Sequence, residues 1–309
     1  MLFIVCPTPS LDCFASATPS GLLVYSQTAG GSGIRVGRTL QQWDTKVQII
    51  APLGGFNGYH VRRLLKAEGL PTRTLMGPIP TQQTCYIQTH DKGMITQEIQ
   101  FAGHNPQGFA NFTKTLIPYF KKAKTLLFCG PLPTHFPEDS YANWIRMAQT
   151  ENPDMAIYMS ASGKTMRTTL TDTTIRLTGI TLSRSEWEAW TGLDFSKQTF
   201  AQHSATTASH ITHTVVIDGE NPVISHHQGH YYRCTPPTFA DEIPGGSIKN
   251  EHPHEIFMAG FVWGLAHQKL SPEAALQAGT LAAAHHCFGK QLSQRDLRKN
   301  LNMVEVLPL

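Results

Sequence analysis

Short apolar runs alternate with stretches of helical period along most of this chain of 309 residues. Runs rich in β-branched residues predict buried strands, and apolar residues at three- and four-residue spacing predict amphipathic helices. An alternation of this kind is typical of a parallel sheet with crossover helices. The expected strands are 2–6, 47–54, 125–130, 155–160, 175–183 and 213–218; the expected helices are 36–43, 59–69, 112–123, 139–149, 185–192 and a helical C-terminal third after residue 255.

Two other segments alternate polar and apolar residues, as strands with one solvent-facing side do. They are residues 22–28 and 84–101, and the second contains an expected hairpin turn at residues 91–93. These segments predict a small β element that projects from the α/β body. Ser140 and Ser185 are the expected N-caps of the helices that follow them.

Charge and cysteine usage narrow the class of partner. The chain has 25 Lys and Arg against 22 Asp and Glu, without a block of like charge, so neither nucleic acid nor a membrane surface is an expected partner. Six cysteines lack CxxC spacing, which favours buried reduced thiols over disulfides. The apolar N-terminus breaks at Pro7 and has no basic segment, so we expect no signal peptide or anchor. We therefore expect a cytoplasmic protein that acts on a small molecule.

A carboxylate and a glycine-rich turn follow the first predicted strand. Asp12 could accept paired hydrogen bonds from sugar hydroxyls, or could simply cap a turn or helix. Glycines in a strand-to-helix turn let the backbone approach a ligand. Together they predict a polyol or nucleoside site at a helix N-terminus. The turn consists of Gly30, Gly31, Ser32 and Gly33.

The run from His252 to Glu255 precedes a long apolar helix and has three interpretations. Glu255 could act as a general base at the start of the helix. The two imidazoles of His252 and His254, with the same carboxylate, are also ligand types found at zinc and iron sites. The third interpretation is a helix start with a structural role only.

Several segments in register resemble the ribokinase-like (PfkB) carbohydrate kinases, and among them the 1-phosphofructokinase and tagatose-6-phosphate kinase branch. Asp12 and the glycine turn resemble its two N-terminal substrate elements, and residues 257–264 resemble its catalytic helix. The other similar segments are residues 52–70, 128–133 and 181–188. The similarity covers nearly the whole chain.

This resemblance implies a ribokinase-like three-layer α/β/α sandwich with a small β-sheet lid. The chain would be a single domain, 1–309, whose lid is formed by about 13–29 and 81–104. It would be an ATP- and Mg²⁺-dependent phosphotransferase acting on a hydroxyl of a sugar or sugar phosphate, and a homodimer through the lid. The resemblance assigns Glu255 as catalytic base; Asp12, Gly30, Gly31, Ser32, Gly33 and Arg35 to the acceptor; Ser183, Glu186, Asp218, Gly219, Gly245, Gly246 and His254 to the nucleotide; and Glu186 to the metal.

The catalytic turn departs from the family pattern. Where the family has Gly-Ala-Gly-Asp, this chain has the residues 252–255, His-Pro-His-Glu. We expect His252 and His254 to resist the positive φ that glycine permits, and Pro253 has no N–H to donate to an anion. The segment 244–247, which contains two adjacent glycines, could rebuild the anion hole.

The phosphate-binding positions also depart from the pattern. Ser32 stands where the branch has Lys, Arg35 where it has Asn, and Gln82 or Gln83 where it has the lid Arg. A sugar phosphate is therefore disfavoured as the acceptor unless Arg35 supplies the missing charge. The nucleotide turn near Asp218 also lacks one residue and its second glycine. The alternative function is therefore a catalytically inactive member that binds a metabolite or partner as a regulator.

Overall fold

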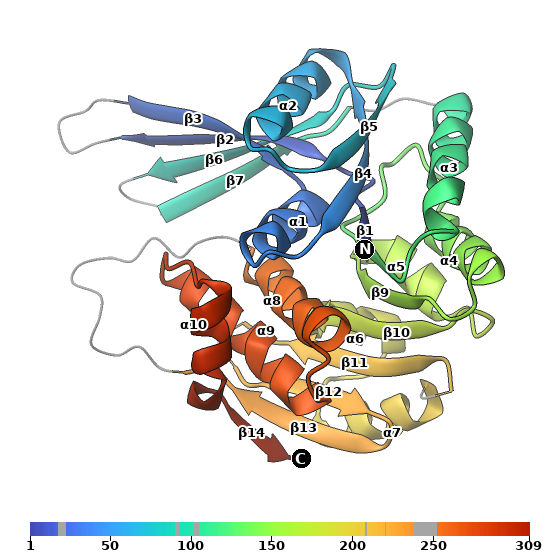
Figure 1. Ribbon diagram of the computed structural model, residues 1–309, viewed down its shortest axis with the longest axis vertical. Coiled ribbons are helices and arrows are strands. Elements are labelled where there is room, and N and C mark those ends of the chain that lie inside the picture. Colours follow the sequence, from blue (N-terminus) through green and yellow to red (C-terminus); the bar gives the residue numbers. More distant parts are fainter. Residues whose placement is uncertain (18–22, 90–92, 102–104, 208, 220, 238–251) are drawn as a thin grey trace.

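Two sheets organise the computed structural model, which describes residues 1–17, 23–89, 93–101, 105–207, 209–219, 221–237 and 252–309 (Figure 1). Within this described part, ten strands form the larger sheet in the order β14-β13-β12-β11-β10-β9-β8-β1-β4-β5. Its strands run parallel from β5 to β11 and antiparallel beyond. The parallel strands are β1 (Leu2–Val5), β4 (Val47–Gly54), β5 (Thr72–Gly77), β8 (Thr125–Cys129), β9 (Ala156–Ser160), β10 (Leu177–Ser183) and β11 (Ile211–Ile217); the others are β12 (Val223–His227), β13 (His230–Thr235) and β14 (Glu305–Pro308).

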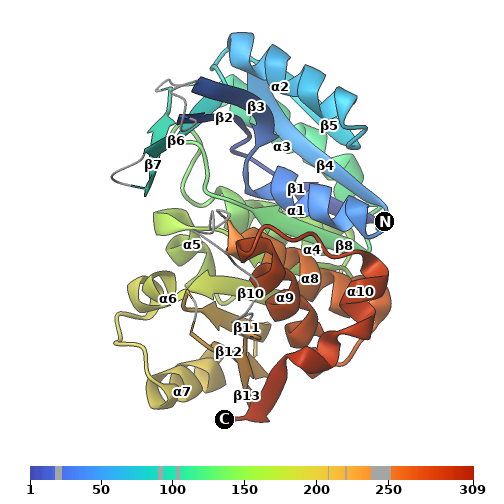
Figure 2. The same cartoon turned by 90° about the vertical axis from the view of Figure 1, so that its left-hand side faces the viewer.

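Helices cover both faces of this sheet because its strands are apolar on both sides. In β1, Leu2 and Ile4 point into one core, whereas Phe3 and Val5 point into the other. Figure 2 shows α8 and α9 on one side of the sheet and α6 and α7 on the opposite side. The first layer consists of α1 (Ser32–Gln42), α2 (Gly55–Ala67), α8 (Pro253–Val262), η1 (Trp263–Gln268), α9 (Pro272–Cys287), α10 (Gln294–Lys299) and η2 (Leu301–Met303); the second consists of α3 (Pro106–Phe120), α4 (Ser140–Glu151), α5 (Gly163–Leu170), α6 (Arg184–Thr191) and α7 (Lys197–Thr207).

A separate four-stranded sheet stands beside the C-terminal ends of β1, β4 and β5 (Figures 1 and 2). Its order is β3-β2-β6-β7, with β2 and β6 parallel and the outer pairs antiparallel. The strands are β2 (Ser10–Ala17), β3 (Leu23–Gly30), β6 (Gln82–Thr89) and β7 (Gly93–Ile99). Asp91 and Lys92 of the expected hairpin turn lie outside the described residues. That this sheet closes as a lid remains a prediction.

The predicted strands and helices are confirmed as elements, except that the C-terminal third, expected to be helical, also contains the strand β14. Two further differences lie at helix starts. The helix expected at 36–43 begins at Ser32, so Ser32 and Gly33 belong to its first turn rather than to a loop. The two predicted N-caps are wrong. Ser140 donates its hydroxyl to Pro137 O instead, and α6 is capped by Ser183. Ser183 prevails because Glu186, three residues later, completes a capping box.

All six cysteines are free, and four of them are buried. In the part of the chain that the structure describes, no helix combines the length and apolar character needed to cross a membrane.

Candidate active site

A buried carboxylate and a buried guanidinium form the centre of the site. Asp12 lies within β2, paired with Thr28 and Thr84, and is 2 % exposed. Ser10 Oγ donates to Asp12 Oδ1 at 2.6 Å, and Arg35 Nη2 donates to Asp12 Oδ2 at 2.5 Å. A Cβ at Gly30 would lie 2.0 Å from Asp12 Oδ2, so this position requires glycine. Asp12 therefore caps neither a turn nor a helix; it is held in a polar cluster.

A second carboxylate, Glu255, reaches the same cluster from the first turn of α8. Ser32 Oγ at the start of α1 donates to Glu255 Oε1 at 2.9 Å. Arg35 Nη1 lies 3.7 Å from the same oxygen. Strand β2 and the N-termini of α1 and α8 thus converge on one point, and both helix dipoles favour negative charge there. The candidate residues Asp12, Ser32, Arg35 and Glu255 are in contact through this network.

The Arg35 guanidinium stays charged although it is buried. Burial opposes its charge, but Asp12, Glu255 and Tyr86 outweigh that effect and raise its pKa. The side chain is 15 % exposed, and its two ion-pair partners are 3 % and 12 % exposed. One internal cation is therefore shared by two carboxylates.

Tyr86 and the ring of His252 complete the cluster, and no sequence motif selects Tyr86. Its hydroxyl accepts from Arg35 Nη2 at 3.1 Å and lies 2.8 Å from His252 Nε2. His252 Nδ1 is 3.7 Å from Glu255 Oε1. Burial and Arg35 lower the pKa of His252 to about 4, so its ring is neutral at pH 7. Strand alternation is the one available signal, since Thr84 and Tyr86 of β6 face the same side as Asp12.

The backbone at residue 252 contradicts the expectation that histidine would resist positive φ. His252 adopts φ 76 and ψ 40, the left-handed conformation that glycine favours. His254, by contrast, lies in the helix without a positive φ. Helix α8 begins at Pro253, and no side chain caps its N-terminus. The N–H groups of the first turn after the proline are thus left without a side-chain acceptor, as an anion site requires.

Four of the predicted nucleotide residues, Ser183, Glu186, Asp218 and Gly219, lie near the ends of β10 and β11, whereas His254 lies in α8. Glu186 Oε2 accepts from Ser183 N at 2.7 Å, which occupies one of its two oxygens in the helix cap. Arg184 bridges Glu188 at 3.0 Å and Asp218 at 3.4 Å on the surface. Gly219 has φ 59, so its turn requires a residue that tolerates a positive φ.

Some nucleotide and metal assignments stay predictions. Gly245 and Gly246 lie outside the described residues. Among the described residues no cluster of three or more His, Cys, Asp or Glu could hold a metal ion, which gives the metal interpretation of His252, His254 and Glu255 no support. A catalytic Mg²⁺ needs fewer protein ligands because it keeps waters and binds phosphates, so the role of Glu186 is untested.

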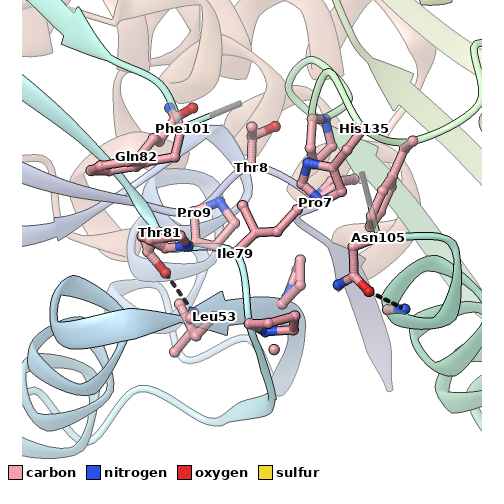
Figure 3. A pocket seen from close by; sticks show the side chains of 18 of the residues that line it. Pro7, Thr8, Pro9, Leu53, Ile79, Thr81, Gln82, Phe101, Asn105 and His135 are labelled. Atoms are coloured by element: carbon pink, nitrogen blue, oxygen red, sulfur yellow. Dashed lines mark hydrogen bonds between the residues drawn. The ribbon is translucent and has the colours of Figure 1, made fainter. Parts of the chain in front are cut away.

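A cavity of about 460 Å³ lies next to the glycine turn of the Asp12 and Glu255 cluster, since Gly31 packs against Thr8 and Pro9 of its lining. It lies between the ends of β1, β4 and β5, the base of the four-stranded sheet, the start of α3 and the loop after β8. Figure 3 shows some of the side chains that line it: Phe101, Gln82, Thr8 and His135 lie in the upper part of the view, and Ile79 lies near the middle. Parts of the similar segments 52–70 and 128–133 line the cavity, and so does Gln82, but the sequence did not indicate that these residues enclose one.

Comparisons with known proteins place this architecture in one class. The fold matches phosphofructokinase-2 from Escherichia coli in complex with fructose-6-phosphate, with a TM-score of 0.80, 19 % identity and coverage of 97 % of this chain and 98 % of that one. It also matches a carbohydrate kinase from Agrobacterium tumefaciens, with a TM-score of 0.72, 18 % identity and 99 % coverage of both chains. These matches confirm the predicted ribokinase-like α/β fold.

Sequence comparisons agree with the fold. The chain is 20 % identical over 311 aligned positions to 1-phosphofructokinase of Bacillus subtilis, covering 97 % of each. It is 26 % identical over 206 positions to 1-phosphofructokinase of Xanthomonas campestris pv. campestris, an alignment that spans 59 % of that relative and 63 % of this chain. The model of the pfkB family carbohydrate kinases matches residues 23–241. The chain belongs to this family, which confirms the predicted reaction class, ATP-dependent phosphoryl transfer to a hydroxyl of a sugar or sugar phosphate.

Proposed function

We propose that this chain is an active kinase in which Glu255 deprotonates a sugar hydroxyl held near Asp12. The observation that carries the proposal is the convergence of both carboxylates on Arg35, at the N-termini of two helices. Phosphoryl transfer depends mainly on positioning and on stabilising charge, and this arrangement can supply both. Nothing in the described residues favours the inactive alternative.

Glu255 is suited to the role of general base by its contacts. Ser32 donates to Oε1, which orients the carboxylate and leaves its second oxygen for an acceptor proton. His252 lies beside it as a neutral ring and so adds no competing charge at pH 7. Asp12 would accept hydrogen bonds from the acceptor hydroxyls. Because Arg35 already donates to Asp12 Oδ2, it would have to share or release that oxygen.

The residues present fit a nucleotide phosphate at the start of α8. The left-handed backbone at His252 and the uncapped first turn leave the N–H groups of His254 and Glu255 as donors to an anion. ATP would supply the phosphoryl group, and Mg²⁺ would neutralise its charge. Ser183, Glu186, Asp218 and Gly219 are the proposed remaining contacts, together with Gly245 and Gly246. A cytoplasmic location and a homodimer belong to the same proposal.

Replacement of the base tests the proposal. Glu255→Gln keeps the size and the Ser32 contact but cannot take a proton, so we expect kcat with ATP, Mg²⁺ and a sugar panel to fall about 10²- to 10⁴-fold. Glu305→Gln, at an exposed residue of β14, is the matched control and should keep full activity. Circular dichroism checks that both variants fold.

Two results would contradict the proposal. Unchanged turnover in Glu255→Gln would remove this carboxylate from the mechanism. A wild-type protein stabilised by ATP or a sugar in thermal shift, yet without turnover across the panel, would support the regulatory alternative.

A further inference from the structure

The cavity beside Asp12 is bounded by unusually rigid and apolar walls. Leu53, Ile79 and Phe101 line it, and so do seven prolines, whose fixed φ leaves little freedom to collapse. Its volume of about 460 Å³ falls within the range of small-molecule sites. The prolines are Pro7, Pro9, Pro52, Pro78, Pro80, Pro131 and Pro133.

The cavity and the carboxylate cluster share a thin wall. A Cβ at Gly31 would lie 2.7 Å from Thr8 O, and one at Gly130 would lie 3.4 Å from Ser32 Cβ. Thr8 Oγ1 donates to Pro131 O and joins the two segments of the wall. Thr8 and Pro131 also line the cavity. Thr8 and Pro131 thus border both the cavity and the glycine turn, which makes the cavity the neighbouring space for a substituent of a sugar held at that turn.

Several polar groups at the cavity are already used within the protein. Thr81 Oγ1 accepts from Gly54 N at 2.9 Å, and Asn105 Oδ1 caps α3 by accepting from Gly108 N at 2.9 Å (Figure 3). Gln100 donates to Glu98 at 3.2 Å. The surface left for a ligand is accordingly more apolar than the residue types suggest.

The described part of this surface carries no positive charge. The described residues that line the cavity include no Lys, Arg, Asp or Glu, and His135 is their one titratable side chain. Burial lowers the pKa of His135, so its ring is neutral at pH 7. The nearby cation, Arg35, is already shared by Asp12 and Glu255. A phosphate placed in the cavity would lose water without gaining a counter-charge, which is costly.

We infer that this cavity binds an uncharged, partly apolar substituent of the acceptor, so the acceptor is a neutral glycoside-like sugar or polyol rather than a sugar phosphate. This inference rests on the proposed function, because it places the acceptor hydroxyl at Asp12 and Glu255. It departs from what the names of the phosphofructokinase relatives indicate for their own acceptors.

Binding measurements test the inference separately from turnover. Calorimetry and thermal shift would compare common hexoses and pentoses with their phenyl glycosides and their phosphates. We expect at least one phenyl glycoside to bind tenfold or more tightly than its parent sugar, and the phosphates to bind no better than the parents. A phosphate preferred over every neutral ligand would overturn the inference even if Glu255→Gln abolished activity.

Variants inside the cavity sharpen the test. A Cβ at Gly77 meets nothing nearer than Leu53 O at 3.7 Å, so Gly77→Leu can fill the space; we expect at least tenfold weaker phenyl glycoside binding with parent-sugar binding unchanged. Gln82→Arg adds a cation to the cavity and should improve phosphate binding at least tenfold. Gln97→Arg, at an exposed residue of β7 that does not line the cavity, should not.

The outcomes separate this inference from the proposed function. Phenyl glycoside binding that is lost in Gly77→Leu, in a protein without turnover, would support the cavity assignment and contradict the kinase mechanism. Equal phenyl glycoside binding in wild type and Gly77→Leu would contradict the cavity assignment alone.

Discussion

At the scale of single residues, Arg35 explains how two acidic groups can share a buried site. Asp12 is almost fully buried, and a buried charge is tolerated only when it is paired and hydrogen-bonded. Arg35 meets both requirements, because it bonds Asp12 and lies within 3.7 Å of Glu255. The sequence could suggest Arg35 as a phosphate ligand. It could not show that the guanidinium is paired with two carboxylates of the same chain.

Removal of this guanidinium should therefore destabilise the fold. Arg35→Met leaves Asp12 buried without its counter-charge, and we expect the free energy of unfolding to fall by about 3 kcal/mol. Arg38→Met is the matched control on the same helix. Its pair with Glu68 is 31 % exposed on both sides, so its loss should cost under about 1 kcal/mol. Urea unfolding at pH 7 measures both, and equal losses would contradict this account of Arg35.

At the scale of elements, the N-terminus of α8 keeps a glycine-like backbone with a histidine side chain. A non-glycine residue in the left-handed conformation costs about 1 kcal/mol, and the bond between His252 and Tyr86 helps to offset that cost. Sequence reasoning failed here because propensity favours glycine at this position, whereas a tertiary hydrogen bond stabilises histidine.

Two substitutions at this position isolate the backbone strain. His252→Ala and His252→Gly both lose the imidazole, but only glycine is relaxed at φ 76. We therefore expect the glycine variant to be more stable than the alanine variant by about 1 kcal/mol in urea unfolding. If the alanine variant were the more stable of the two, the turn would not have the left-handed backbone.

The antiparallel end of the large sheet contains a second feature at this scale, a stacked histidine pair. The rings of His213 in β11 and His227 in β12 lie 4.2 Å apart, and Phe261 of α8 packs edge-on against His213. Burial, with the neighbouring His227 and His226, lowers the pKa of His213 from 6.5 to about 3. On acidification, His213 therefore becomes protonated at a much lower pH in the folded chain than in the unfolded chain.

This difference predicts acid sensitivity. The contribution of His213 to the free energy of unfolding is fully present above about pH 6.5. It is lost as the pH decreases toward 3, because the unfolded chain takes up the proton at a higher pH than the folded chain. Between pH 6.5 and 4.5 we expect His213→Phe to lose about 2 kcal/mol less than the wild type. The exposed His230→Gln should follow the wild-type profile. Urea unfolding across this range measures the slope, and a slope unchanged in His213→Phe would refute the assignment.

At the scale of the whole molecule, the sequence predicted the architecture better than the site. Strand and helix periodicity is a local property, so β1, β4, β8 and α2 could be located without knowledge of their neighbours. The cavity could not be predicted in this way, because Pro7, Ile79 and His135 come from distant segments and meet only in the fold. The same limit applied to Tyr86, whose role depends on Arg35 and His252.

The outer face of the four-stranded sheet supports the proposed homodimer. The side chains of Tyr25, Ile87 and Ile99 are 59 %, 40 % and 47 % exposed. Tyr25 of β3 and Ile87 of β6 both pair with Ala15 of the strand between them, β2, so they lie in one row on the same face. Tyr86 and Asp12 face the other way, toward the site. Large apolar side chains grouped on a solvent-facing sheet are typical of an association surface.

A charge placed on this face should separate the subunits. We expect the wild type to have the mass of a dimer in light scattering at micromolar concentration, and Ile87→Glu to have that of a monomer, because pairing would bury an uncompensated carboxylate. Phe56→Glu replaces another side chain that is 86 % exposed, on α2, and should leave the dimer intact. A monomeric wild type would exclude the dimer, and a dimeric Ile87→Glu would place the interface elsewhere. Since the same sheet carries Asp12 and Tyr86 on its inner face, loss of the dimer should also lower kcat if pairing holds these side chains in place.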